Sequence, residues 1–131
     1  MAISFDKALG VSQYTVGVRS QRAEMLASNI VNADTPHYKA RDLDFAQAMR
    51  SAQTNMSTSM TRTHEKHFKV SVEDVDSQKY RIPNQPDTGD GNTVDVQVER
   101  NLYMQNSLEY QSSLQFLGGK FKGLNLAIKG A

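Results

Sequence analysis

Apolar side chains recur along the first thirty residues at alternating steps of four and three. Such steps are typical of an amphipathic helix that presents a narrow seam to a partner helix. The pattern predicts one long helix from Ile3 to Val31. Gly10 and Gly17 lie inside it, and each weakens a helix interior by about 1 kcal/mol relative to Ala. The stripe is made of Phe5, Leu9, Ser12, Val16, Arg19, Ala23, Leu26 and Ile30.

Residues from Thr93 to the end of the chain repeat the same alternation. Asn92 or Thr93 is expected to cap this helix, with Asp95 in its first turn, where a carboxylate favours the helix dipole. We expect the two long helices to pair as an antiparallel coiled coil, and other subunits to cover the apolar residues outside the seams. The second stripe is made of Val96, Arg100, Tyr103, Ser107, Tyr110, Leu114, Leu117, Phe121, Leu124 and Ile128.

The segment between the two helices is polar. It predicts a partly disordered insert that carries a short β segment, in a fold that is otherwise mainly α. We divide the chain into an N-terminal helix (residues 1–33), a turn motif with the insert (34–92) and a C-terminal helix (93–131). Both helices are assigned to one coiled-coil domain.

Within the insert, the segment from Lys39 to Arg50 fits a short helix, and residues 51–63 form a low-complexity stretch that we expect to be mobile. Phe68, Val70 and Val72 alternate with polar residues, which is the period of a half-buried strand. A second extended piece is expected at Tyr80 and Ile82, before a turn-rich loop over residues 83–92.

A compact polar motif ends the first helix. Pro36 disfavours an α conformation at the residue before it, so the helix should stop near Asn32 or Ala33. Asn29 and Asn32 lie three apart and share a helix face. Asn32 and Thr35 can each fold a side chain back on the backbone, which favours a fixed turn. With Tyr38, these residues predict a joint rather than a reaction centre.

Composition excludes several kinds of site. The 131-residue chain has no cysteine, so disulfides and thiolate chemistry are excluded. Its net charge of +1, with basic residues dispersed among acids, argues against a nucleic-acid partner. We find neither a cleavable signal peptide at the start nor an apolar run of the ~20 residues that a membrane span needs.

Candidate catalytic and metal sites are weak. His64 and His67 lie three apart, but only His37 could add a third imidazole, so solvated histidines are the better interpretation. Asp87-Thr-Gly89 matches the tripeptide of aspartic proteases, yet it follows a proline in a hydrophilic loop instead of a buried strand. We therefore expect no enzyme, no cofactor and no metal.

The segment from Ala27 to Lys39 resembles the N-terminal signature of the flagellar axial proteins, the rod and hook family. Val31 and His37 stand where the family pattern has Ala and Gly. The resemblance continues at residues 40–45, 81–86, 90–95 and 106–111 and at Gly123-Leu124. Together with its short length, these segments make the chain similar to the B-type proximal rod proteins. The signature positions are Asn29, Asn32, Thr35, Pro36 and Tyr38.

The resemblance implies a structural subunit of the periplasmic rod in the flagellar basal body. Such a protein is exported without a cleaved signal peptide and joins an axial tube that transmits torque and conducts exported subunits. Implied partners are copies of itself, other proximal and distal rod proteins, the MS-ring/rod junction protein and the export gate. The alternative is a stand-alone helical adaptor or export chaperone, which a motile deletion strain with intact rods would favour.

Overall fold

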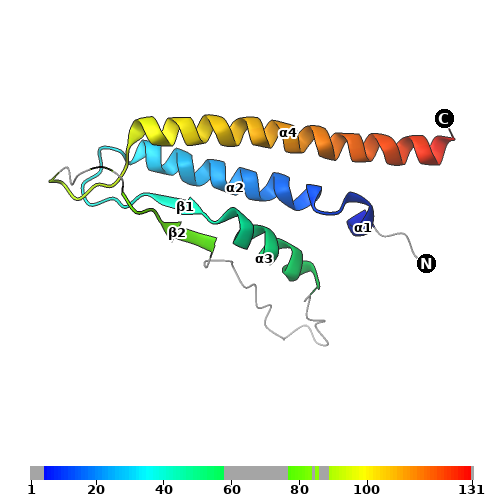
Figure 1. The fold of residues 1–131 in the computed structure, drawn as a ribbon, viewed down its shortest axis with the longest axis horizontal. Helices are drawn as coiled ribbons and strands as arrows, with labels where there is room; N and C mark the ends of the chain where they lie inside the picture. The colour runs from blue at the N-terminus through cyan, green and yellow to red at the C-terminus, as the bar shows by residue number, and fades with distance from the viewer. Residues whose placement is uncertain (1–4, 58–76, 84, 86–88, 131) are drawn as a thin grey trace, which may run out of the picture.

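The computed structural model describes residues 5–57, 77–83, 85 and 89–130. Two long helices lie side by side, and a small hairpin with a shorter helix packs along one of them (Figure 1). The helices and strands of the chain are, in order, α1 (Phe5–Leu9), α2 (Ser12–Val31), β1 (Arg41–Leu43), α3 (Phe45–Ser57), β2 (Gln78–Tyr80) and α4 (Val96–Lys129).

The α2 and α4 helices run antiparallel, as expected for a mainly α fold with paired terminal helices (Figure 1). The α4 helix begins at Val96, and its cap is Asp95, not Asn92 or Thr93 as predicted. Asp95 Oδ1 accepts hydrogen bonds from the backbone N–H groups of Gln97 at 3.0 Å and Val98 at 3.3 Å. Gly130 ends the helix in the left-handed conformation that glycine adopts without strain.

The prediction of one continuous N-terminal helix is wrong. The helix stops at Leu9 and resumes at Ser12, because Gly10 adopts a left-handed backbone with φ of 58°. The predicted stop at the other end is confirmed: α2 ends at Val31, and Asn32 is its C-terminal cap.

The described part of the insert differs in two places from the elements predicted for it. The segment predicted as a short helix over 39–50 is instead a strand followed by α3, which reaches Ser57 and so enters the stretch expected to be mobile. The β1 and β2 strands pair antiparallel, with Asp42 opposite Lys79. The predicted strand at Phe68–Val72 lies outside the described residues.

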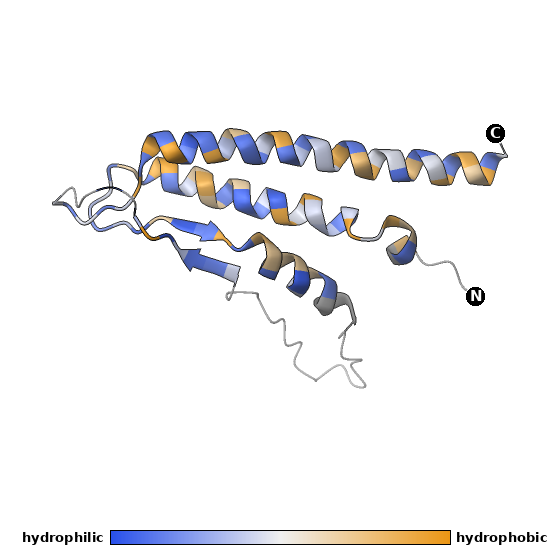
Figure 2. Cartoon of the chain, viewed as in Figure 1, coloured by the Kyte–Doolittle hydropathy of each residue, from blue (hydrophilic) through white to orange (hydrophobic). Residues whose placement is uncertain are grey.

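A small apolar core joins the insert to α2. It contains Val18 of α2, Leu43 of β1, and Ala48 and Met49 of α3, all buried. In contrast, hydrophobic residues recur along α4 as far as its C-terminal end (Figure 2), and many of them are exposed. None of the helices described here is both long and apolar enough to cross a membrane.

Candidate functional site

The end of α2 is held by its own side chains. Asn32 donates from both its backbone N–H (3.2 Å) and its Nδ2 (2.8 Å) to the Ser28 carbonyl, which a helix end otherwise leaves without a partner. The Thr35 hydroxyl donates to Asn32 Oδ1 at 3.2 Å, and the Thr35 N–H donates to the Asn32 carbonyl. Pro36 is exposed. It contributes through its restricted backbone, since it has no N–H to donate.

The turn after Pro36 needs an unusual backbone at His37. Its φ is 62°, in the left-handed region that favours glycine. The His37 N–H donates to the Asp90 carbonyl at 2.9 Å, which ties this turn to the loop before α4. The neighbouring Gly91 also has a positive φ of 70°, and a Cβ there would meet His37 Nδ1 at 2.8 Å. The two loops therefore touch where only glycine fits.

Asn29 lies at the centre of this region, with none of its surface exposed. Its Nδ2 donates to the Arg41 carbonyl at 2.7 Å and to Glu99 Oε2 at 3.1 Å. Its Oδ1 accepts from the Arg41 N–H at 3.1 Å and from the Tyr38 hydroxyl at 3.2 Å. The amide thus makes all four hydrogen bonds that asparagine can form. It joins α2, β1 and α4 at one point.

Tyr38 fixes the chain as it leaves the turn. Its hydroxyl lies 3.3 Å from Ser28 Oγ. The phenol has one hydrogen, which goes to Asn29, so Ser28 is the donor in this pair. The Tyr38 carbonyl accepts from the Thr93 N–H at 3.1 Å, and Thr93 Oγ1 accepts from the Ala40 N–H at 2.8 Å. The strand that leaves the turn therefore pairs with the segment that enters α4.

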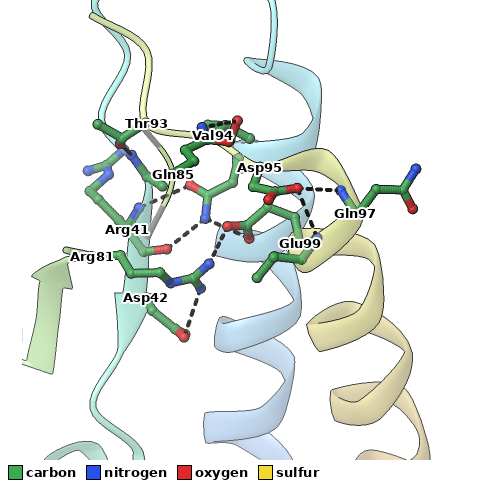
Figure 3. Close-up of polar contacts among 12 residues, drawn as sticks. Arg41, Asp42, Arg81, Gln85, Thr93, Val94, Asp95, Gln97 and Glu99 are labelled. Carbon is green, nitrogen blue, oxygen red and sulfur yellow. Dashed lines mark hydrogen bonds and ion pairs between the residues drawn. The ribbon is translucent and has the colours of Figure 1, made fainter. Parts of the chain in front are cut away.

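Four charged side chains extend the contacts made by Asn29. Arg81 lies between Asp42 and Glu99 (Figure 3). It donates to Asp42 Oδ2 at 2.9 Å and to Glu99 Oε1. Arg22 of α2 binds Asp42 with both Nε (2.9 Å) and a terminal nitrogen (3.0 Å), a bidentate pair. Two positive and two negative charges are thus balanced, and the Glu99 side chain is only 1% exposed.

The ion pair between Arg22 and Asp42 shifts the pKa values of both groups. Burial raises the pKa of Asp42, but the hydrogen bonds from Arg22, the Leu43 N–H and Arg81 outweigh it and lower that pKa overall. The hydrogen bond to Asp42 raises the pKa of Arg22, which is charged at any physiological pH in either case. Both ions are therefore held in their charged forms.

Asn92 closes the site from the α4 side. Its Nδ2 lies within hydrogen-bond distance of the carbonyls of Asn32 (3.0 Å), Ala33 (2.7 Å) and Thr35 (2.9 Å), which follow the end of α2. Its Oδ1 accepts from the Val94 N–H at 2.8 Å. We call the whole set the polar joint. Its members are Arg22, Asn29, Asn32, Thr35, Tyr38, Asp42, Arg81, Asn92 and Glu99.

A second polar contact lies further along the helix pair. Asn106 is 1% exposed and donates to the Arg19 carbonyl at 3.0 Å. The Arg19 guanidinium pairs with Glu109 and lies 4.0 Å from the centroid of the Phe45 ring. Asn92, Glu99 and Asn106 are seven residues apart, so the last two follow the side of α4 that packs on α2.

Several signature residues therefore come together, whereas the seam residues behave differently from one another. In this chain Leu9 and Leu26 are buried, Val16, Ile30, Tyr110, Leu117 and Leu124 are half-buried, and Phe5, Tyr103, Leu114 and Phe121 are exposed. On the first half of α4, Glu99 and Asn106 are buried, next to the positions where we placed the seam. The contribution of the seam to assembly stays a prediction.

The geometry of the polar joint suits holding segments in place. Each of its carboxylates is paired with arginine, and within the described residues no three His, Asp or Glu side chains gather as metal ligands would. His64, His67 and Asp87 lie outside the described residues. What the joint does is connect both long helices and the hairpin through hydrogen bonds.

Sequence reasoning missed the charged half of this site. The sequence pattern assigns no partner to Glu99 or Arg81, because nothing within a few positions of either marks one. The spacing of seven residues between Asn92, Glu99 and Asn106 was the available signal, because residues at heptad spacing share one helix face and a polar residue at a core position can specify how helices pair. The local members, Asn29, Asn32, Thr35 and Tyr38, were all visible in the motif.

The similarity of this chain to known proteins extends over nearly its whole length. No protein-family model matches it. It is 56% identical over 130 residues to the flagellar basal body rod protein FlgB of Aeromonas hydrophila, covering 99% of this chain and 98% of that protein. It is 42% identical over 131 residues to FlgB of Escherichia coli K12, covering 95% and 94%. It is 40% identical over 127 residues to FlgB of Cereibacter sphaeroides, covering 96% and 97%.

Proposed function

The chain belongs to the family of FlgB flagellar basal body rod proteins, and from this premise we propose that it self-assembles into the proximal part of the periplasmic rod. In that role it is a structural subunit of an axial tube that transmits torque and conducts exported subunits. It reaches its place through the flagellar export apparatus, without a cleaved signal peptide. Its neighbours are copies of itself, other rod proteins, the MS-ring/rod junction protein and the export gate.

One observation supports assembly above the others: the C-terminal half of α4 lacks cover. No residue from Gln111 to Lys129 is buried. Phe116 is 71% exposed and Ile128 is 83% exposed, with Leu114, Phe121 and Leu126 between 43% and 49%. Monomeric proteins rarely leave so many large apolar side chains in water along one element. Contact with neighbouring subunits would remove this surface from water.

Coupled folding and association follows from the same observation. An isolated helix is marginal in water unless tertiary packing covers an apolar face. The first half of α4 has such cover from α2 and the polar joint, whereas the second half, which meets α1, is at most half-buried. We therefore infer that the second half gains most of its stability when a neighbouring subunit packs on it.

The test is complementation of a strain from which the gene is deleted. Leu114→Ser and Phe121→Ser together should leave the subunit folded and exported but reduce rod assembly and motility strongly. Asn125→Ser, at an exposed polar position of the same half, is the matched control and should assemble normally. Normal rods in the double variant would contradict the proposal. If the deletion strain itself were motile, the proposed role in the rod would be ruled out.

The motif at the end of α2 supplies a second test of the proposal. We expect Asn32→Leu and Pro36→Ala to impair rod assembly more than secretion, because they alter where the chain leaves the helix pair. Asp34→Ala, at an exposed position in the same turn, is the control. The measurements are the amount of subunit in the culture medium and in purified basal bodies. Normal assembly of both variants would make the motif incidental.

A further inference from the structure

The second half of α4 has two different sides. Leu114, Phe121 and Ile128 are seven residues apart, so they form one row along the helix, and they are 43%, 44% and 83% exposed. We call this row the ridge. Phe116 and Gly123 each follow a ridge residue by two positions, and two residues turn an α-helix by roughly 200°. They therefore lie on the opposite side of α4.

That opposite side carries an apolar depression. It lies between α4 and α1, which are in contact near the C-terminal end of α4 (Figure 1). None of the residues around it is fully buried, so the depression is open to solvent. The lining consists of Ala8 of α1 and of Gln115, Phe116, Gly119, Lys120, Gly123 and Leu124 of α4.

The two glycines of the depression have no role in packing the subunit itself. Neither Gly119 nor Gly123 has the positive φ that favours glycine, and a Cβ at either position would meet no atom of the described chain within 4 Å. Glycine weakens a helix interior relative to alanine. Because the two lie four residues apart, their missing side chains open one face of α4. The space suits a side chain that comes from outside the subunit.

The charges of α4 favour contact between its two different sides. From Gln111 to Lys129 the helix carries three lysines and no acidic residue. Lys120 lines the depression, so two depressions that faced each other would bring like charges together. The ridge residues, and the positions three and four residues before each of them, are all uncharged. A ridge can therefore meet the depression of a second copy without this repulsion.

We propose that the ridge of one copy packs into the depression of a second copy. Phe121 lies midway in sequence between Gly119 and Gly123, so two parallel copies place its ring between the two glycines. The surfaces that meet differ on the two partners, so the contact can repeat from copy to copy, whereas a contact between two ridges would stop at a dimer. This inference rests on the proposed function, for which it names the surfaces in contact.

Cysteine cross-linking tests which surfaces meet, because the chain has no cysteine of its own. Phe121→Cys in the ridge, Gly123→Cys in the depression and the chain with both changes are each produced in the deletion strain, and purified basal bodies are oxidised. The chain with both changes should give disulfide-linked dimers and higher multimers, because a disulfide needs Cα atoms within about 7 Å. Each single variant should give none.

Three cross-linking results would overturn the inference. Dimers from Phe121→Cys alone would show that ridges meet each other. Cross-links to a different protein only would show that the occupant of the depression is not a second copy. Basal bodies that contain the chain with both changes but yield no multimers would show that ridge and depression do not meet.

Filling the depression from within the subunit gives a test that needs no cysteine. Gly123→Leu should leave the free chain at least as resistant to urea, because leucine forms helix better than glycine. Overpacking of a contact by this amount weakens it roughly tenfold or more, so basal bodies should contain correspondingly less of this variant. Gln111→Leu, at an exposed position outside the depression, is the control and should assemble normally.

The outcomes separate this inference from the proposed function. A folded and exported Gly123→Leu subunit that enters the rod as well as wild type would refute the contact between ridge and depression and leave the rod role standing. Motility of the empty deletion strain would instead refute the rod role itself.

Discussion

The two halves of α4 have opposite surfaces, although both continue one helix. The first half buries two polar residues, Glu99 and Asn106, against α2 and satisfies Glu99 with Arg81 and Asn29. The second half has no fully buried residue and exposes apolar residues such as Phe116 and Ile128. Hydrogen-bond partners that must meet in fixed geometry define a fold, whereas uncovered apolar area can accept a neighbour. The difference supports the proposal that the first half specifies the subunit and the second serves association.

The largest effect should come from Glu99→Ala. This change removes a buried carboxylate that balances the charge of Arg81. Arg81 keeps only Asp42 as an ion-pair partner, and the Asn29 amide loses one of its four hydrogen bonds. Breaking a buried ion pair in this way costs about 3–5 kcal/mol of unfolding free energy. Urea denaturation of the free chain measures it. Gln111→Ala, at an exposed position of the second half, is the control; equal loss in the two variants would erase the contrast between the halves.

Asn92→Ala should rank next. The side chain donates to part-buried carbonyls that follow α2 and accepts from the buried Val94 N–H, so its loss removes these hydrogen bonds together. We expect a loss of about 2 kcal/mol of unfolding free energy in the same urea experiment. Asn125→Ala, at an exposed asparagine of the second half, should change it by less than about 0.5 kcal/mol. A similar loss in both would show that the Asn92 hydrogen bonds contribute little.

Gly91→Ala tests the contact between the two loops. Positive φ and the approach to His37 should together cost about 1–3 kcal/mol. The cost of Gly91→Ala should be smaller in a chain that also carries His37→Gly, because the side chain that the new Cβ meets has been removed. A double-mutant cycle by urea denaturation gives this coupling. An identical cost in both backgrounds would show that backbone strain at Gly91 explains the whole effect.

Acid should weaken the joint through Asp42. The pKa of Asp42 is lower in the folded chain than in the unfolded one, so the unfolded state binds more protons as the pH falls. The stability that Asp42 provides is complete above its unfolded pKa of about 3.9 and is lost as the pH falls through the folded pKa. Asp42 is half-buried, so this loss should be smaller than that from Glu99→Ala.

Comparison with Asp42→Asn isolates this contribution. Asp44, whose pKa is lowered chiefly by the hydrogen bond from Lys79, titrates in the same range, and it remains in both chains. The difference in unfolding free energy between wild type and Asp42→Asn should therefore shrink below about pH 4. A difference that stays constant down to pH 2 would contradict the role given to the Arg22 and Arg81 ion pairs.

The smallest effect on the free chain is expected from Leu114→Ser with Phe121→Ser. Both side chains are more than two-fifths exposed, so their removal should change the unfolding free energy by less than about 0.5 kcal/mol each. The same pair is expected to reduce rod assembly strongly. The control Gln97→Ala, at an exposed position of the first half, should leave rod assembly normal. Marked destabilisation of the free chain would mean that the second half already has a partner within the subunit.

Local sequence alone determined the elements whose causes lie within a few residues. Pro36 and the side chain of Asn32 end α2, Asp95 marks the start of α4, and the heptad alternation predicts two paired helices. These features depend on backbone sterics and on hydrogen bonds spanning up to four positions, which a linear pattern contains.

The tertiary structure decided the rest. Asn29 meets Glu99 across 70 positions, and Asn92 meets Asn32 across 60, so no local pattern could assign these partners. The break at Gly10 is the same kind of outcome: the periodicity favours one helix, but in the folded chain Gly10 adopts φ of 58° and Leu9 is buried. Side-chain partners distant in sequence are chosen by packing and charge compensation, and these exist only once the helices have come together.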